Sequence, residues 1–136
     1  MLRVVLDPGV LVSALLVAEG PPGRILDRWR QGELELVVSD TLLAELEDVL
    51  HRPRLASRVD ERDARAYVAG IRRAARVFDD PPAEPGLTPD PGDDYLVALA
   101  RAAGADLIVS GDAHLAGLAD SEPPVLTPRA FADMLG

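Results

Sequence analysis

The chain has 136 residues, a formal net charge of −9 and no cysteine, which excludes disulfides, thiolate metal sites and a cysteine nucleophile. All 14 basic residues are arginine, and the absence of lysine excludes P-loop nucleotide binding and Schiff-base chemistry. The acidic balance argues against binding nucleic acid through the whole surface, and the length predicts one domain over residues 1–136.

The N-terminal stretch predicts a buried strand, a tight turn and a helix. A β-branched, apolar run ends at Asp7, Pro8 and Gly9 follow, and aliphatic residues then recur at helical spacing as far as Leu16. Asp7 therefore lies at the carboxyl end of a predicted parallel strand, where open α/β sheets gather their ligand groups. It also suits a helix N-cap with Pro8 as the first helical residue, so capping and chemistry both remain open.

The middle of the chain alternates helical patterns with short strand patterns. It predicts a turn over 20–23, a helix over 24–31, a strand over 33–38, a helix from Ser39 or Asp40 to about His51, and a helix over 60–76. Residues 77–78 are too short a run to assign to a strand. The proline-rich stretch 79–92 predicts an irregular connection.

The last third predicts a buried helix over 93–103 and a buried strand over 106–109, followed by a turn at Ser110-Gly111-Asp112. A short helix over 113–118, a strand residue at Val125 and a C-terminal helix from Thr127 to about Leu135 complete the chain. Strands separated by helices predict a three-layer α/β/α sandwich with a central, mostly parallel sheet of four to five strands. Asp7 and the 110–112 turn then share one edge of that sheet.

Acidic residues dominate the candidate site, namely Asp7, Glu45, Asp94 and Asp112. Carboxylates gathered in one cleft repel one another, which implies either raised pKa values or a bound cation. Oxygen ligands without histidine or cysteine favour Mg²⁺ or Mn²⁺. A magnesium ion held by carboxylates serves phosphate chemistry, because it activates water and stabilises the charge that develops on phosphoryl oxygens.

Short motifs along nearly the whole chain carry a family resemblance, in the order 4–7, 10–16, 25–27, 35–39, 42–46, 90–96, 103–112 and 127–131. Together they resemble the PIN-domain family of metal-dependent ribonucleases, in particular the VapC-like toxins of bacterial type II toxin–antitoxin pairs. The resemblance implies a PIN-like fold and metal-binding roles for Asp7, Glu45, Asp94 and Asp112. It also implies a supporting role for the Ser110 hydroxyl, with Asp93 beside the third acid.

The sequence departs from the family pattern directly after Asp7. The family usually has Asp-Thr-Asn, whereas this chain has Asp7-Pro8-Gly9 and so lacks a hydroxyl and an amide that help to hold the acidic cluster. Losses of this kind cost about 10–100-fold in metal affinity or activity. Reduced or absent activity is therefore an open alternative.

Each acidic residue also has a purely structural interpretation. Glu45 and Glu47 lie on opposite borders of one apolar helix face, so helical geometry does not choose between them and only the resemblance favours Glu45. Asp93 and Asp94 suit the negatively charged first turn of a helix. Asp112 and Ser110 suit turn and helix caps, and His114 fits an exposed turn histidine.

Arginines gather on the side of the 60–76 helix away from its apolar stripe, at Arg62, Arg65, Arg72, Arg73 and Arg76. Arginine binds two phosphate oxygens at once, so this face is a candidate guide for an RNA strand. The alternative is a solvated helix face balanced by Glu61 and Asp63.

The leading hypothesis is hydrolysis of RNA phosphodiester bonds by metal-activated water, with Asp7, Asp94 and Asp112 holding Mg²⁺ and Glu45 holding a second ion or orienting the water. One alternative is a degenerate PIN domain that binds RNA or protein without cutting it. Another is a phosphatase or phospho-signalling domain with Asp7 as nucleophile, which the missing lysine disfavours. The resemblance further implies a small antitoxin in the cleft and a homodimer. Without a membrane-length apolar run or a signal-type start, we expect a cytoplasmic protein with no membrane segment.

Overall fold

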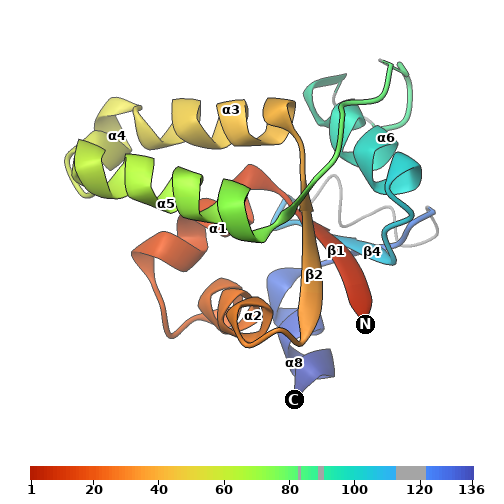
Figure 1. Ribbon diagram of the computed structural model, residues 1–136, viewed down its shortest axis with the longest axis horizontal. Coiled ribbons are helices and arrows are strands. Elements are labelled where there is room, and N and C mark those ends of the chain that lie inside the picture. Colours follow the sequence, from red (N-terminus) through yellow and green to blue (C-terminus); the bar gives the residue numbers. More distant parts are fainter. Residues whose placement is uncertain (83, 89–90, 113–121) are drawn as a thin grey trace.

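The structure is a computed structural model of the chain, and it describes residues 1–82, 84–88, 91–112 and 122–136. The predicted helix over 113–118, and His114 with it, lie outside the described residues. Within them the chain forms an α/β sandwich around an all-parallel sheet (Figure 1). The predicted fold class is therefore confirmed.

The sheet has five strands in the order β3-β2-β1-β4-β5. Their bounds are β1 Leu2–Leu6, β2 Leu34–Val38, β3 Arg76–Val77, β4 Leu107–Val109 and β5 Val125–Leu126. From β1 the chain proceeds outward through β2 to β3, and then returns to the other side of β1 to form β4 and β5. The two directions diverge at β1 and β4, and open α/β sheets bind ligands at such a point.

The helices are α1 (Pro8–Leu16), α2 (Pro21–Arg30), α3 (Asp40–Leu50), α4 (Pro53–Ala56), α5 (Glu61–Ala74), α6 (Asp94–Ala102) and α8 (Pro128–Leu135), with a 3₁₀ turn at Pro91–Asp93. Helix α1 packs against α2 and α3, α3 packs against α5, and α8 packs against α2. Helix α6 contacts β4 and β1. Figure 1 accordingly shows α3 and α5 to one side of the strands and α6 to the other.

Three elements differ from the sequence prediction. The helix predicted over 60–76 ends at Ala74, and Arg76 lies in strand β3 because it pairs with β2 there. Helix α2 begins at Pro21, within the predicted turn, because proline is tolerated in the first turn of a helix, where its missing N–H would have no intrahelical partner. Residues 53–56 form the short helix α4, which the pattern did not predict and which also begins at a proline. In the predicted irregular connection over 79–92, the described residues 79–82 and 84–88 form no helix or strand, and a 3₁₀ turn begins at Pro91.

The register of β1 places its last residues beside those of β4. Val5 lies opposite Ile108 and Leu6 opposite Val109, and the Asp7 N–H donates to the Val109 carbonyl at 3.0 Å. Asp7 and Ser110 therefore leave the sheet side by side, although 103 residues separate them in the sequence. Val4, Val5 and Leu6 are fully buried, so this part of the backbone is fixed by the hydrophobic core.

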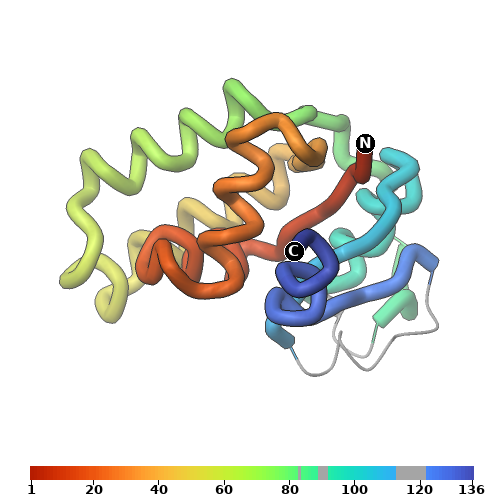
Figure 2. Tube along the Cα trace, turned by 90° about the horizontal axis from the view of Figure 1, so that it is seen from below, coloured from red at the N-terminus to blue at the C-terminus, as the bar shows by residue number. Residues whose placement is uncertain are grey.

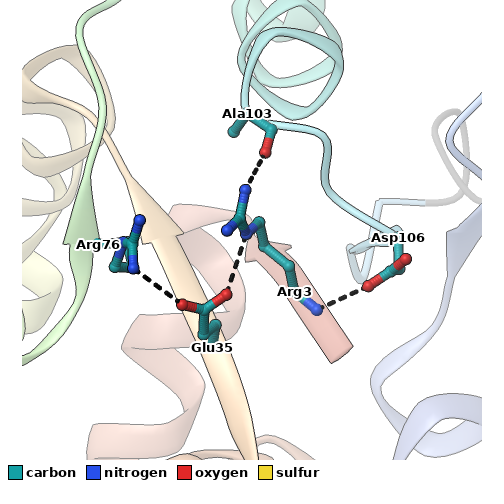
Figure 3. A network of polar contacts seen from close by, with 5 residues as sticks. All are labelled: Arg3, Glu35, Arg76, Ala103 and Asp106. Carbon is teal, nitrogen blue, oxygen red and sulfur yellow. Dashed lines mark hydrogen bonds and ion pairs between the residues drawn. The ribbon is translucent and has the colours of Figure 1, made fainter. Parts of the chain in front are cut away.

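The opposite part of the sheet is held by a polar network (Figure 3). The Arg3 guanidinium donates to Glu35 at 3.0 Å and to the Ala103 carbonyl at 2.6 Å, while the backbone N–H of Arg3 donates to Asp106 at 2.8 Å. Arg76 donates to the second oxygen of Glu35 at 3.2 Å. This network joins β1, β2 and β3 to the segment that follows α6.

The C-terminus directly follows α8, and the tube view in Figure 2 shows the N-terminus, at the start of β1, apart from this helix. In the portion of the chain described, no single helix combines the length and apolar character needed to cross a membrane. Helices α1 and α2 meet those criteria only as a pair bent by 95°.

Candidate functional site

Asp7 lies at the carboxyl end of β1, and both oxygens of its carboxylate accept hydrogen bonds. Oδ1 accepts from the Val10 N–H at 2.8 Å, which caps the N-terminus of α1, and Oδ2 accepts from the Ser110 hydroxyl. The residue is only 8% exposed. Burial raises the pKa of Asp7, the charges of Asp112 and Glu45 raise it further, and the two hydrogen bonds oppose the shift. Asp7 therefore caps α1 and also lies near the other acidic side chains, so both of its interpretations are compatible with the structure.

Ser110 connects the ends of β1 and β4. It is fully buried, its hydroxyl donates to Asp7, and its oxygen accepts the backbone N–H of Asp112 at 3.0 Å. The single hydroxyl thereby fixes the direction of the Asp7 carboxylate and the backbone of the 110–112 turn. Asp112 thus stands close enough to Asp7 for the two charges to interact.

Glu45 reaches the same region from α3. It is half-buried and accepts a hydrogen bond from the Tyr95 hydroxyl through Oε2, whereas Glu47 is exposed. Burial raises the pKa of Tyr95 strongly, and so do the hydrogen bond to Glu45 and the charges of Glu45, Asp7 and Asp93. The phenol therefore remains a neutral donor among acidic side chains. Sequence reasoning missed Tyr95, because an aromatic residue in the first turn of a buried helix has the same pattern as a core residue.

The adjacent residues Asp93 and Asp94 have different surroundings. The Asp94 carboxylate, in a residue only 7% exposed, accepts from the Thr88 N–H at 2.7 Å, the Thr88 hydroxyl at 2.8 Å and the Gly86 N–H at 3.1 Å. The hydroxyl bond first, and then the backbone bonds, hold the pKa of Asp94 below its ordinary value. Both of its oxygens thus fasten the proline-rich connection to α6. Oδ2 of Asp93 is buried, and the Asp93 charge acts on the Tyr95 hydroxyl.

The donor set suits a hard divalent cation by chemistry and charge. Asp7, Glu45 and Asp112 supply carboxylate oxygens, and their mutual repulsion is relieved by a cation. Over residues 1–82, 84–88, 91–112 and 122–136, however, no three histidine, cysteine, aspartate or glutamate side chains are gathered closely enough to hold a metal ion. Asp112 and Glu45 therefore lie near enough to Asp7 to affect its pKa, but the three carboxylates do not form a closed coordination site.

A cavity of about 370 Å³ opens beside Asp7 and Asp112. Gly9, Ser13 and Pro22 also line it, so it extends from the acids towards α1 and α2. A Cβ atom built on Gly9 would lie 3.3 Å from Oδ1 of Asp7. A side chain at position 9 would thus press on the Asp7 carboxylate, and glycine leaves space there.

The candidate RNA-binding arginines, four on α5 and Arg76 on β3, are largely engaged with carboxylates. Arg65 pairs with Glu61 at 3.2 Å, Arg72 with Asp40 at 2.9 Å, and Arg76 with Glu35 at 3.2 Å. In the part of the chain that the structure describes, no hydrogen bond or ion pair engages the guanidinium groups of Arg62 and Arg73. These two arginines are accordingly the better placed to bind phosphate.

Comparison with protein families finds a match to the PIN domain over residues 3–114. A search of curated proteins finds no match. Among solved structures, PAE2754 from Pyrobaculum aerophilum is 18% identical with a TM-score of 0.67, covering 98% of this chain and 89% of that one. These values show a shared fold.

Two further structures have related folds. VapBC2 from Rickettsia felis, bound to a DNA fragment from its promoter, is 13% identical with a TM-score of 0.62, covering 93% of this chain and 98% of that one. VapC20 from Mycobacterium tuberculosis, a toxin that cleaves the sarcin–ricin loop, is 19% identical with a TM-score of 0.51, covering 77% and 86%.

Proposed function

Because the chain belongs to the PIN domain family, we propose that it is a divalent-metal-dependent ribonuclease, with residues 1–136 forming one nuclease domain. We further propose that it is the toxin of a toxin–antitoxin pair, as the VapC fold neighbours suggest. The observation that carries the proposal is that Asp7, at the carboxyl end of β1, lies buried and near enough to Asp112 and Glu45 for their charges to act on it; burial and these charges raise its pKa. A site that disfavours its own negative charge is suited to a cation.

The residues proposed to hold Mg²⁺ or Mn²⁺ are Asp7, Glu45 and Asp112, with one aspartate from the start of α6. When bound, such an ion supplies an activated water and stabilises charge on the phosphoryl oxygens. Ser110 keeps the Asp7 carboxylate oriented through its hydroxyl. For the fourth acid we propose Asp93 beside the original candidate Asp94, because the Asp94 oxygens already accept three hydrogen bonds.

The substrate proposed is a structured RNA, and the partner proposed is an antitoxin that covers the cleft. The R. felis structure contains VapBC2 with promoter DNA, and VapC20 cleaves the sarcin–ricin loop. By analogy, a sarcin–ricin oligonucleotide is the first RNA to test. A homodimer is expected from the family resemblance, and light scattering of the purified chain measures it.

The decisive experiment is a cleavage assay on structured RNAs with Mg²⁺ or Mn²⁺. We expect cleavage by the wild type, none by Asp7→Asn, and none in EDTA. Glu45→Gln should lose most activity, whereas Glu47→Gln, which alters an exposed glutamate of the same helix, should retain it. Full activity in EDTA, or equal loss in both glutamine variants, would contradict the proposal.

A second candidate function is RNA or protein binding without cleavage. Two observations favour it: Pro8-Gly9 follows Asp7, and among the described residues the acids do not gather into a three-ligand group. Isothermal titration with Mn²⁺ separates the two candidates. Micromolar binding that Asp7→Asn abolishes supports the nuclease, whereas RNA binding without Mn²⁺ binding supports the degenerate domain.

A further inference from the structure

Glu45 and Tyr95 come from two different helices, and their side chains meet beside Asp7. Glu45 projects from the middle of α3, and Tyr95 is the second residue of α6. The Tyr95 hydroxyl donates to Oε2 of Glu45 across 50 residues of sequence. The ring is half-buried and packs against the hydrophobic core, so the hydroxyl is presented from a fixed platform.

We infer that Tyr95 is a positioning residue that fixes the Glu45 carboxylate in the orientation the acidic site requires, an inference that rests on the proposed nuclease function. A glutamate side chain has three rotatable bonds, and ordering it costs conformational entropy. A donor held by the core reduces that cost before any ligand arrives. Glu45 of α3 is then oriented by α6, whose N-cap is Asp93 and whose first residue is Asp94.

The chemistry of the donor suits this task better than a charged group. An arginine or lysine at this position would neutralise Glu45 and weaken its attraction for a cation, whereas a phenol donates a hydrogen bond and adds no charge. Tyr95 therefore gives the Glu45 carboxylate a fixed direction and adds no positive charge beside it.

The other tyrosine of the chain provides a matched control. The Tyr67 hydroxyl of α5 donates to the Leu11 carbonyl at 2.6 Å, and it too is partly buried. Tyr67→Phe and Tyr95→Phe each remove one oxygen and one hydrogen bond, and both keep the ring. Only Tyr95→Phe removes a contact to a candidate catalytic residue.

The test compares RNA cleavage and Mn²⁺ binding for the wild type, Tyr95→Phe, Tyr67→Phe, Glu45→Gln and the Tyr95→Phe/Glu45→Gln double variant. We expect Tyr95→Phe to lower kcat about 10-fold or more with KM for RNA nearly unchanged, and Tyr67→Phe to stay within twofold of the wild type. In the Glu45→Gln background the tyrosine change should cost little, because residues that act as a unit are not additive. Thermal unfolding of each variant verifies that it is folded.

The outcomes separate this inference from the proposed function. If the wild type cleaves RNA and Tyr95→Phe is as active, or if Tyr67→Phe loses as much, the inference is overturned and the nuclease remains. If the wild type cleaves nothing, the nuclease proposal fails and Mn²⁺ titration decides about Tyr95. A roughly 10-fold weaker affinity in Tyr95→Phe alone supports the positioning role, and equal affinities, or no binding to the wild type, overturn it.

Discussion

Asp7 has two structural roles that make opposite demands on stability. Its carboxylate caps α1 through Val10, which stabilises the helix, and it is buried beside Asp112 and Glu45, which destabilises its charged form. A charge retained at such a cost is typical of a functional position. Asparagine caps helices about as well as aspartate and carries no charge, so the two roles can be separated experimentally.

The first prediction concerns the pH dependence of Asp7→Asn. Because the pKa of Asp7 is raised in the folded chain, its contribution to stability is present at low pH and is lost as pH rises through the folded pKa. Asp7→Asn should therefore unfold at a higher temperature than the wild type at pH 7, and this advantage should vanish near pH 3. Differential scanning calorimetry at both pH values measures it.

Added Mg²⁺ provides the complementary measurement. A ligand that binds the folded state raises its stability, so Mg²⁺ should raise the melting temperature of the wild type and leave that of Asp7→Asn unchanged. A variant that is less stable at pH 7, or equally stabilised by Mg²⁺, would argue against a cation at Asp7.

The second prediction distinguishes the two aspartates at the start of α6. Asp93→Asn should reduce cleavage at least 10-fold with little change in melting temperature, because its charge acts on the Tyr95 hydroxyl among the site acids. Asp94→Ala should lower the melting temperature, because it removes the acceptor of three hydrogen bonds from Gly86 and Thr88. Since the pKa of Asp94 is lowered by folding, this stabilisation should disappear on acidification below the ordinary aspartate pKa. If Asp94→Ala loses cleavage without a change in melting temperature, and Asp93→Asn keeps its activity, Asp94 is the metal ligand instead.

At the scale of elements, the start of α2 packs tightly on the loop before it. A Cβ built on Gly23 would lie 2.0 Å from the Ala18 carbonyl oxygen, which is far inside contact distance. Gly70, in the middle of α5, has nothing within 4 Å of its built Cβ. Gly23 is required because the backbone of the preceding loop approaches it closely, whereas Gly70 has no such neighbour and only weakens its helix.

The third prediction compares alanine at these two glycines. Gly23→Ala should destabilise the fold by about 1–3 kcal/mol or more, because the loop or the helix must move. Gly70→Ala should stabilise it by about 0.5–1 kcal/mol, because alanine is the better helix former. Urea unfolding curves with an unchanged slope give both values. If Gly23→Ala leaves the free energy of unfolding unchanged, the loop over 17–20 moves aside at little cost.

Sequence patterns predicted the elements whose local signals agree. The helix that follows Asp7 and the C-terminal helix that follows Thr127 each have a cap, a proline in the first turn and an apolar period. Both helices, and the strand before Asp7, are found nearly as expected. Strand β3 spans only Arg76–Val77, and it exists because β2 offers it a partner. No window of two residues contains that information.

At the scale of the molecule, a strongly acidic chain carries a face of arginines on α5. Ion pairs of Arg65 with Glu61 and of Arg72 with Asp40 reduce the positive charge of that face, and Arg62 and Arg73 are exposed. Any electrostatic contribution to RNA binding from α5 should therefore come mainly from these two.

The fourth prediction is that Arg62→Glu/Arg73→Glu weakens RNA binding and lowers the slope of log K against log salt by about 1–2. Arg129→Glu on α8, away from α5 in Figure 1, serves as a control for a change in charge elsewhere. Fluorescence anisotropy of labelled RNA between 50 and 200 mM salt, roughly the range over which phosphate contacts are screened, gives the slopes. If the wild type, the double variant and Arg129→Glu show the same slope of log K against log salt, Arg62 and Arg73 of α5 do not contact the RNA phosphates.

The strand order explains which parts of the site were predictable. The parallel β/α pattern was sufficient to place Asp7 and the 110–112 turn at one edge, because carboxyl ends of parallel strands coincide. The hydrogen bond between Tyr95 and Glu45, and the anchoring of Asp94 by Thr88, depend on how α6 and the proline-rich connection pack. Such contacts leave no periodic signal in the sequence.

The hydrogen bond from the Val10 amide to Asp7 couples the acidic site to the first turn of α1. The Val10 N–H also donates to the Asp7 backbone carbonyl at 3.1 Å, so a ligand that turns the carboxylate away removes one of its two acceptors. Faster deuterium uptake at Val10 should therefore report a ligand that moves the Asp7 carboxylate, and it is measured without RNA and without a mutation.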